Sequence, residues 1–423
     1  MDRRVVVTGM GVCAPNGTGL EAFASALGSG RSGIRFEPEL KALSFGCQIA
    51  GKPLFDETHL NKYFKPVQQR GLLASGLVYG VMAGVDAWED AGLGMDAEEP
   101  DWDSGVIFGT GLLGVDKLRE SIYHVDAGQV RRLGSTAVSQ TMASGISAYL
   151  GGMLGCGNQV STNSSACSTG AEAVLMAWER IRNGAALRML AGSCSDSGPY
   201  IWGGFDAMRI LPRNFNDDPA SASRPMSATA AGFVPGSGAG ALLLESLESA
   251  LDREAPIYAE VLGGSVNCGG QRAGGSMTAP NSLAVQRCIT QALEIAGVHP
   301  WEVDTINGHL TATGKDVEEI ANWSKALGRK GPDFPYVNSF KGTLGHCLAA
   351  AGSIECVASL LQMKEGTLFG NVNCEDLHPD IVPWANPDRI PQKPLSFTPN
   401  ILAKASFGFG DVNACIIFKR FTP

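Results

Sequence analysis

The sequence predicts an α/β fold, and three observations support this prediction. Short runs of apolar and β-branched residues alternate with longer segments of helical pattern along the whole chain. The short runs lack the strict alternation of a half-exposed strand, as expected for sheets that are buried on both faces. The element order before residue 250 is similar to the order after it, in a chain of 423 residues that is long enough for two or three domains.

The first half begins with a β-branched run and then alternates between strand and helix. The strand predictions rest on short apolar runs, and the helix predictions rest on longer segments with helical spacing of apolar residues. The expected strands are Val5–Gly9, Gly105–Phe108, Gln159–Thr162, Leu187–Ala191 and Ala239–Glu245. The expected helices are Leu72–Ala91, Ala137–Leu154, Ala171–Asn183 and Ser246–Arg253.

The second half repeats this pattern from a β segment that begins at Ile257. No low-complexity tract or long linker separates the halves, so residues 1–250 and 251–423 are expected to be two halves of one body. Residues 370–400, rich in proline and asparagine, are expected on the surface. The other expected elements are helices 282–296, 316–327 and 347–364 and strands 303–306, 336–339, 402–407 and 414–419.

Composition argues against several classes of protein. The chain has 33 Lys and Arg against 42 Asp and Glu, whereas a nucleic-acid-binding protein normally carries a basic surplus. The eleven cysteines are odd in number and none forms a CxxC pair, so neither a disulfide framework nor a zinc site is expected. Residues Met1–Gly9 contain no hydrophobic signal region, and the long uncharged run 133–171 is interrupted by polar residues. We therefore expect a cytoplasmic protein without a membrane-spanning segment.

Cys167 gives the strongest local signal of chemistry. It lies in Ser164–Gly170, a run of small residues between a predicted strand and a predicted helix. A thiol at a helix N-terminus lies near the positive end of the helix dipole, which is expected to lower its pKa and favour the thiolate. Small neighbours permit the sharp turn of a nucleophile elbow. The alternative is a buried structural cysteine, which we expect for the other ten.

Two of the six histidines lie in turns of the second half that are rich in glycine and threonine. His309 follows a predicted strand, and His346 precedes a predicted helix. Such positions can direct a ring nitrogen into a cleft, where imidazole acts as a base or a hydrogen-bond donor. The alternative for each is a structural histidine. Together with Cys167 they would form a Cys-His-His set, if the fold brings the three together.

A third signal lies in Ser406–Gly410, at the end of a predicted strand. Glycines beside an aromatic residue let the backbone approach a ligand and offer N–H groups to an oxyanion. A tight bulge around a core phenylalanine is the alternative. The glycine-rich segments Gly109–Gly111 and Gly236–Gly240 lack the lysine and hydroxyl residue of a phosphate loop, so a nucleotide cofactor is not expected.

At these motifs the sequence resembles the β-ketoacyl-acyl carrier protein synthases, the decarboxylating condensing enzymes of fatty acid and polyketide synthesis. The resemblance covers essentially the whole chain and implies a duplicated thiolase-like αβαβα five-layered sandwich that forms a homodimer. The motifs that carry it are Val5–Gly11, the Ala166–Gly170 elbow, His309 in a threonine-rich turn, Lys341 five residues before His346, and Ser406–Gly410.

The resemblance implies a decarboxylative Claisen condensation. Cys167 would take an acyl group from a thioester of acyl carrier protein or coenzyme A, with the backbone amides of Cys167 and Phe409 as the oxyanion hole. His309 and His346 would hold the malonyl thioester while carbon dioxide leaves and the carbanion attacks the acyl-cysteine. The product would be a 3-oxoacyl thioester, formed with ping-pong kinetics and with no cofactor beyond the phosphopantetheine of the substrates.

The resemblance also implies supporting residues. Lys341 and Glu319 match the lysine and glutamate that organise the histidines, and Thr311 and Thr313 match threonines that contact the pantetheine arm. Phe409 matches the gate of the acyl pocket. The other expected substrate-binding residues are Leu112, Phe205 and Gly408.

An acyl carrier protein is the expected partner, and family members dock it with basic residues around the tunnel mouth. A solvated basic face without a partner is the alternative, and a heterodimer with a second ketosynthase-like chain is the alternative to a homodimer. Neither a nucleic acid nor a membrane is expected as a partner. The matching basic residues are Arg131, Arg132 and Arg209. The family's basic pair near residue 71 is Gly71-Leu72 here, and the residues expected to compensate are Lys62, Lys65 and Arg70.

Two departures from the family pattern lie beside the predicted site. Leu310 replaces the glycine that usually follows the first histidine, and we expect it to narrow the pantetheine entrance. Asp411 stands where the family commonly has glycine, and it would either alter chain-length choice or be a solvated turn residue. The predicted catalytic residues are retained, so these departures concern the acyl chain more than the chemistry.

Two other functions are alternatives to the condensing synthase. A non-catalytic, chain-length-setting subunit of a heterodimer typically lacks the nucleophile, and Cys167 is present here. A degradative thiolase carries a second catalytic cysteine in a Cys-x-Gly turn near the C-terminus, and Cys415 is not followed by that glycine. The condensing synthase is therefore the favoured hypothesis.

Overall fold

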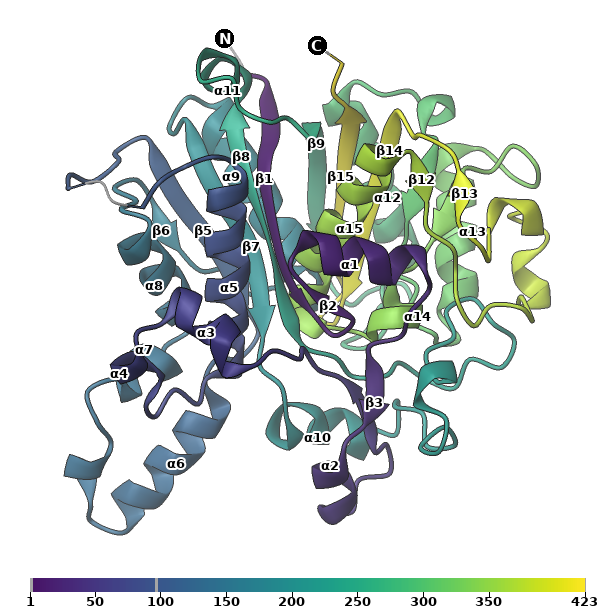
Figure 1. Cartoon of the computed structure of the whole chain (residues 1–423). Helices are drawn as coiled ribbons and strands as arrows, with labels where there is room; N and C mark the ends of the chain where they lie inside the picture. The colour runs from purple at the N-terminus through teal and green to yellow at the C-terminus, as the bar shows by residue number, and fades with distance from the viewer. Residues whose placement is uncertain (1–2, 96–97, 423) are drawn as a thin grey trace.

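The computed structural model describes residues 3–95 and 98–422 (Figure 1). Met1 and Asp2, part of the N-terminal run considered above, lie outside the described residues. Within the described ranges, no helix is both long and apolar enough to span a bilayer.

The strands are β1 (Val5–Ala14), β2 (Gly17–Thr18), β3 (Ile34–Phe36), β4 (Ile49–Gly51), β5 (Ser104–Thr110), β6 (Val160–Ser161), β7 (Arg188–Ser195), β8 (Gly238–Ser246), β9 (Ala259–Cys268), β10 (Thr305–Asn307), β11 (Tyr336–Asn338), β12 (Thr367–Leu368), β13 (Leu395–Ser396), β14 (Ile401–Gly408) and β15 (Val412–Arg420).

Fifteen α-helices in the described residues accompany these strands, together with seven short 3-10 turns. The helices are α1 (Leu20–Gly28), α2 (Pro38–Ala42), α3 (Glu57–Tyr63), α4 (Pro66–Gln69), α5 (Ser75–Asp90), α6 (Val115–Asp126), α7 (Ala137–Thr141), α8 (Gly145–Met153), α9 (Thr169–Arg182), α10 (Pro199–Ala207), α11 (Leu247–Asp252), α12 (Ser282–Ala296), α13 (Asp316–Leu327), α14 (Lys341–Leu344) and α15 (Ala351–Glu365).

Most strands follow one path through the molecule, in the order β11-β10-β14-β15-β9-β1-β8-β7-β5-β6. The two halves of this path meet where β1 pairs with β9 over only three residues, Val5–Val7. Beyond these residues the two strands do not pair, and helices α9 and α15 pack between the two half-sheets. Helices α5 and α8 cover the outer face of the first half-sheet, and α12 and α13 cover the outer face of the second. The arrangement is the αβαβα sandwich that the resemblance implied.

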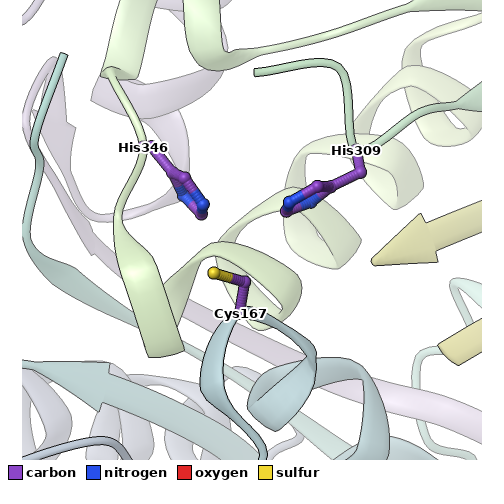
Figure 2. A group of neighbouring side chains, drawn as sticks. All are labelled: Cys167, His309 and His346. Carbon is purple, nitrogen blue, oxygen red and sulfur yellow. The ribbon is translucent and has the colours of Figure 1, made fainter. Parts of the chain in front are cut away.

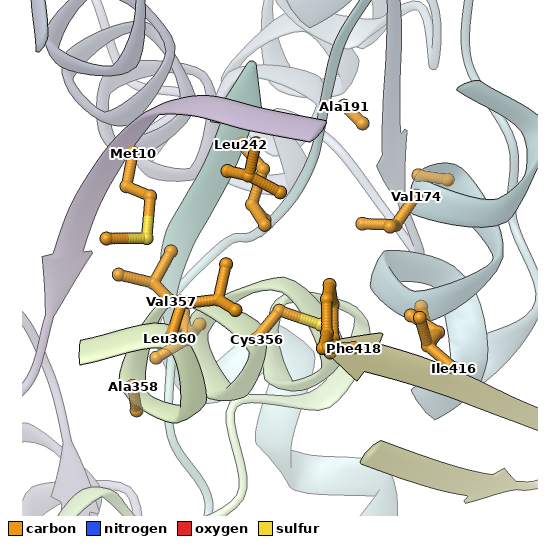
Figure 3. Close-up of a cluster of buried hydrophobic side chains, with 14 of the residues drawn as sticks. Met10, Val174, Ala191, Leu242, Cys356, Val357, Ala358, Leu360, Ile416 and Phe418 are labelled. Carbon is orange, nitrogen blue, oxygen red and sulfur yellow. The ribbon is translucent and has the colours of Figure 1, made fainter. Parts of the chain in front are cut away.

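The middle layer contains the largest buried apolar cluster. Figure 3 shows Met10 and Leu242 of the first half-sheet and Phe418 of the second half-sheet gathered around α15. All three side chains are fully buried, and burial of one such side chain stabilises the fold by about 1.5–3 kcal/mol. Since this cluster includes strands of both half-sheets, the middle helices hold the two halves together.

The carboxyl ends of the parallel strands converge on the middle of the molecule. In the second half, β10 is parallel to both β11 and β14, so the segments after Asn307, Asn338 and Gly408 emerge at one edge. In the first half, β5 is parallel to β6 and β7, and β6 leads into the 3-10 turn Ala166–Ser168. Loops at the carboxyl ends of parallel strands are where α/β proteins place their binding sites.

The α/β alternation predicted from the sequence is confirmed, but the prediction of one helix is wrong. The predicted helix Ala137–Leu154 is two helices, α7 and α8, because Met142 takes an extended conformation that ends α7. The chain then turns so tightly that a Cβ atom on Gly145 would lie 2.2 Å from the carbonyl oxygen of Ser139. Helices α1, α6 and α10 were not predicted. Residues 370–400 form only short turns and the strand β13, but Ile381 and Ile390 in this segment are buried.

Candidate active site

Cys167 lies in the 3-10 turn Ala166–Ser168 that leads directly into α9. The preceding residue, Ala166, has a φ of 50°, in the left-handed region that non-glycine residues rarely adopt. Helix α9 braces the turn, because the Glu172 carboxylate accepts hydrogen bonds from the Ser165 hydroxyl and from the side-chain amide of Asn163. The sharp elbow expected around Cys167 is therefore present.

Close contact between two helices fixes the start of α9. A Cβ atom on Gly170 would lie 2.4 Å from the backbone nitrogen of Ser353, and one on Gly352 would lie 2.6 Å from that of Ala171. Such distances are too short for any side chain. Glycine at both positions therefore lets α9 and α15 touch backbone to backbone directly beneath Cys167.

The two histidines face Cys167 from the second half of the chain, as Figure 2 shows. One ligand-type atom from each of Cys167, His309 and His346 lies within 4.8 Å of the other two, and all three residues are buried. The two imidazole rings are 5.2 Å apart between centroids and nearly perpendicular, at 80°. The fold thus brings together the Cys-His-His set that the sequence could only suggest.

Glu319 holds the turn that carries His309. Its two carboxylate oxygens accept hydrogen bonds from the backbone N–H groups of His309, at 2.6 Å, and Leu310, at 2.7 Å. Burial raises the pKa of Glu319 to about 7, although these two N–H groups favour the ionised form. Burial and the charge of Lys341 hold the pKa of His309 well below its usual range, so the ring is neutral at physiological pH.

His346 is oriented by the backbone that follows it. The N–H of Leu348 donates to His346 Nδ1 at 3.2 Å, which places the proton of the neutral ring on Nε2. Burial, with the charges of Lys341 and Lys404, lowers the pKa of His346 well below its usual range. The Phe233 ring packs edge to face with the imidazole, and the two ring centroids are 5.2 Å apart. The ring therefore offers a fixed N–H donor.

Lys341 does not contact a histidine directly but belongs to a buried ion cluster. Its ammonium binds Glu355 Oε1 on α15, and Lys404 of β14 binds Glu355 Oε2 at 2.9 Å. All three side chains are almost completely buried. Sequence reasoning missed Glu355 and Lys404, although each is a lone charge within an apolar run, in Ser353–Leu361 and Ile401–Ala405. A single charge in such a run is the signal that would have found them.

The expected low pKa of the nucleophile is wrong. Burial raises the pKa of the Cys167 thiol to about 11, and this effect outweighs the opposing influences of the Phe409 backbone N–H and the Lys341 charge. The resting group is therefore a thiol, because desolvation of the sulfur dominates over its place at a helix start.

The backbone amides of Phe409 and Cys167 both act on the sulfur, since hydrogen bonds from these two groups oppose the rise of its pKa. Gly408 makes the approach possible, because a Cβ atom there would lie 3.1 Å from the Cys167 nitrogen. Two N–H groups that converge beside a nucleophile have the geometry of an oxyanion hole.

A cavity of about 250 Å³ leads to Cys167 from the second half of the chain. The hydroxyls of Thr311 and Thr313 lie 3.1 Å apart in its wall, and Asp316 holds their turn by accepting N–H bonds from Thr311 and Ala312. Other predicted site residues in this wall are His309, His346, Glu319, Phe205, Gly408 and Phe409.

A second, mainly apolar cavity reaches Cys167 from the first half. Leu112, Ile201, Phe205 and Met208 line it, and Phe409 lies in the walls of both cavities. Phe205 and Phe409 pack edge to face with centroids 6.0 Å apart. Leu112 therefore lines only this second cavity, Thr311 and Thr313 line only the first, and Phe205 and Phe409 line both.

The two departures from the family pattern lie elsewhere than expected. Leu310 is fully buried, packs in the core of the second half and does not line the entrance cavity, so it does not narrow that cavity. Asp411 is also fully buried, and its carboxylate accepts backbone N–H bonds from Gln271, at 2.9 Å, and Asn281, at 2.7 Å. It is therefore not a solvated turn residue. It ties the Phe409 turn to the segment 269–281, which contributes Thr278 to the cavity.

The basic residues predicted for docking do not line either cavity of this chain. Arg209 lies between Met208 and Ile210, which do line them, so it is at the rim. Lys62 is paired with Asp86 and Glu89, at 2.6 and 2.8 Å, and its charge is largely neutralised. The remaining four, Lys65, Arg70, Arg131 and Arg132, are exposed.

The same Cys-His-His set is the only group of its kind in the described residues whose spacing could suit a metal ion. A thiolate and two imidazoles are donor types that Zn²⁺ accepts. These are also the three groups that face the junction of the two cavities, where a substrate would have to bind.

Two family models match most of the chain. The family model described as Beta-ketoacyl synthase, N-terminal domain, matches residues 2–250, and Beta-ketoacyl synthase, C-terminal domain, matches residues 258–375. The chain is 35% identical to 3-oxoacyl-(acyl-carrier-protein) synthase I, chloroplastic, of Arabidopsis thaliana, covering 100% of this chain and 87% of that protein. It is 31% identical to 3-oxoacyl-(acyl-carrier-protein) synthase 1 of Escherichia coli strain K12, covering 99% of each.

Solved structures are similar over the whole chain. A β-ketoacyl synthase from Burkholderia phymatum superposes with a TM-score of 0.89 at 27% identity, covering 99% of this chain and 100% of that one. A type II polyketide ketosynthase, solved in complex with its acyl-carrier protein and bound to the hexaketide, superposes with a TM-score of 0.88 at 28% identity and full coverage of both chains.

Proposed function

The chain belongs to the β-ketoacyl synthase family and is a carbon–carbon bond-forming acyltransferase, and we propose that Cys167, His309 and His346 catalyse its condensation reaction. Its function is that of a 3-oxoacyl-(acyl-carrier-protein) synthase. The observation that carries the proposal is the position of Cys167, within 4.8 Å of both histidines and at the junction of two cavities.

In the first step Cys167 accepts the acyl group. The sulfur attacks the thioester carbonyl of the donor, a new carbon–sulfur bond forms, and the pantetheine thiolate leaves and takes up a proton. The backbone N–H groups of Cys167 and Phe409 stabilise the oxyanion. Because the resting group is a thiol, the sulfur loses its proton as it attacks, and this proton is the one that the leaving pantetheine sulfur takes up.

In the second step the two histidines act on the malonyl thioester. Its carbon–carboxylate bond breaks, carbon dioxide leaves, and the electron pair forms an enolate whose oxygen accepts the N–H groups of His309 and His346. The enolate carbon then attacks the acyl carbonyl, and Cys167 leaves as a thiolate and is reprotonated. Neutral rings suit this role because they already carry the N–H bonds that the enolate requires.

The roles of the neighbouring residues follow from their places. Glu319 positions His309, and Lys341 acts on both rings through its charge. Thr311 and Thr313 bind the pantetheine arm in the entrance cavity. Leu112, Phe205, Gly408 and Phe409 shape the acyl pocket and its gate.

We propose an acyl carrier protein as the partner that delivers both substrates. The type II polyketide ketosynthase solved in complex with its acyl-carrier protein supports this, as do the carrier proteins in the names of the curated relatives. Arg209, at the rim, is the docking residue best placed in this chain, and Lys65, Arg131 and Arg132 offer further free charges. We also propose that the protein is a homodimer in the reducing cytoplasm. Within each chain, residues 1–250 and 251–423 are the two repeated halves. The reaction needs no cofactor beyond the phosphopantetheine of the substrate.

The test supplies the purified chain with acyl and malonyl carrier thioesters and measures the 3-oxoacyl product and carbon dioxide. We expect equal amounts of the two, loss of the product in Cys167→Ala, and no loss in the control Cys156→Ala. Absence of product while Cys167 can still be alkylated would refute the proposal. A second chain that co-purifies in fixed ratio, with activity unaffected by Cys167→Ala, would instead support a chain-length-setting subunit.

A further inference from the structure

Lys404 is a buried cation that the mechanism above does not use. It lies in β14, four residues before Gly408, and its side chain is completely buried. A lysine is almost never fully buried unless it is paired, because removal of an ammonium from water costs several kcal/mol. A charge in this position therefore requires an explanation.

The Lys404 ammonium is held by three groups. It binds Glu355 Oε2 at 2.9 Å, donates to the backbone oxygen of Ala405, and donates to the Ser406 hydroxyl at 3.2 Å. The backbone oxygen of Ser406 in turn accepts a hydrogen bond at 3.1 Å from the hydroxyl of Ser168, the residue after the nucleophile. Lys404 is thus anchored to the segments that carry both oxyanion-hole amides.

The cluster carries an unbalanced charge. Among the described residues, Glu355 is the only carboxylate within ion-pair distance of either Lys341 or Lys404. Two ammoniums share one carboxylate, so one positive charge remains in excess in a buried region. Either lysine alone would be balanced by Glu355, so the excess exists only because Lys404 is present beside Lys341.

The titratable groups that face Lys404 come from several elements. Glu355 and Cys356 face it from α15, Cys415 from β15, and Lys341 lies across Glu355 on α14. Burial is the main cause that holds the pKa of His309 and His346 below the usual range, and the charges of Lys341 and Lys404 add to it. The excess charge therefore acts on the imidazoles that contact the substrate.

We propose that Lys404 is a positioning residue that supplies the excess positive charge of the site, keeping His309 and His346 as neutral N–H donors and stabilising the enolate. The inference rests on the proposed function for its effect on the enolate. Its effect on the histidines is independent of any reaction. Electrostatic stabilisation of this kind is strong because the groups are shielded from water.

The primary test is a pH titration of the histidine rings, monitored by NMR with ring-¹³C-labelled histidine. The variants His309→Gln and His346→Gln assign the resonances to the two rings. In Lys404→Met we expect the protonation midpoints of His309 and His346 to rise by about one pH unit. Lys404→Arg keeps the charge and is expected to retain the wild-type midpoints. Lys419→Met, which removes an exposed lysine from β15, is the matched control and should change nothing.

A second readout is carbon dioxide release from a malonyl carrier thioester at pH 8, where the rings are neutral in every variant. We expect a loss of about tenfold in Lys404→Met and little loss in Lys404→Arg. Unchanged histidine midpoints in a folded Lys404→Met protein, or equal shifts in the Met and Arg variants, would overturn the proposal. If Lys404→Met does not fold, Lys404→Gln takes its place. If the wild type releases no carbon dioxide, the proposed function fails but the histidine titration still decides the role of Lys404.

Discussion

The two walls of the active site are built in different ways. On the first wall, Cys167 is positioned by backbone geometry: a left-handed residue before it, glycine contacts beneath it and amide groups around it. On the second wall, His309 and His346 are surrounded by buried charges, from Glu319 to the cluster of Lys341, Glu355 and Lys404.

This difference fits the role that we propose for each wall. A nucleophile that attacks a carbonyl needs an exact approach, which rigid backbone contacts provide. Groups that stabilise a developing negative charge need a fixed electrostatic environment, which buried ions provide. We therefore expect changes in the first wall to act through packing, and changes in the second wall to act through charge.

The largest expected effect is on condensation, in a variant that removes the nucleophile of the first wall and leaves the second wall intact. Cys167→Ala should lower condensation by at least about a thousandfold, because no covalent intermediate can form. It should still release carbon dioxide from a malonyl thioester, since that step requires the second wall only. Product and carbon dioxide are measured on the same sample. Loss of both activities in a folded variant would show that the walls do not act separately.

The next effect concerns stability. Glu355→Gln leaves two buried ammoniums without a counter-charge, and we expect a loss of about 3–5 kcal/mol in the free energy of unfolding. Urea unfolding followed by circular dichroism measures it. Glu248→Gln, on an exposed part of α11, is the control and should change stability by less than about 0.5 kcal/mol. A change in Glu355→Gln as small as that in the control would contradict a stabilising role for the ion cluster.

A smaller effect is expected from packing at the first wall. Gly170→Ala places a methyl group against the backbone of Ser353, and we expect it to destabilise the protein by about 1–3 kcal/mol. Gly152→Ala, in helix α8 with open space around it, should be neutral or stabilise by up to about 1 kcal/mol. Thermal unfolding compares the two variants. Equal stabilities would contradict the tight helix contact beneath Cys167.

The pH dependence of the nucleophile gives a milder test. With a pKa of about 11, Cys167 should react with iodoacetamide about a hundredfold faster at pH 9 than at pH 7, because the thiolate fraction rises tenfold per unit. Free cysteine, with a pKa near 8.5, should show a smaller rise that levels off. Mass spectrometry of the Cys167 peptide follows the reaction. A plateau below pH 8 would show that the helix start lowers the pKa after all.

The smallest effect is expected on substrate binding, from a change in the turn beside the entrance cavity. Asp411→Ala removes the acceptor that ties the Phe409 turn to residues 269–281, and we expect a rise of a few fold, about 1 kcal/mol, in the KM for carrier thioesters. The turnover number should change less. Steady-state kinetics with one acyl donor measures both values, and an unchanged KM would mean that the turn is held without this side chain.

Much of this architecture could be predicted from the sequence, because strand and helix periodicity and the small-residue elbow are local patterns. Cys167, His309 and His346 each stood in a recognisable turn. Their proximity could not be predicted from residues alone, since it depends on the packing of two half-sheets around α9 and α15.

What the sequence did not predict is long-range and electrostatic. The pKa of Cys167 depends on burial, which a helix-start motif does not reveal. Leu310 and Asp411 looked like surface or entrance residues because their neighbours in sequence are turns, yet both side chains are fully buried. Glu355 and Lys404 are 49 positions apart in the sequence and pair only in the folded chain.

We propose that acyl transfer and decarboxylation belong to separate walls of the site, and the variant His309→Ala separates the two steps. The protein is incubated with an acyl carrier thioester, its intact mass is recorded, and carbon dioxide release from malonyl carrier thioester is then measured. We predict that Cys167 gains the mass of the acyl group while carbon dioxide release is lost. A folded His309→Ala protein that fails to acylate, or that releases carbon dioxide at the wild-type rate, would contradict the account.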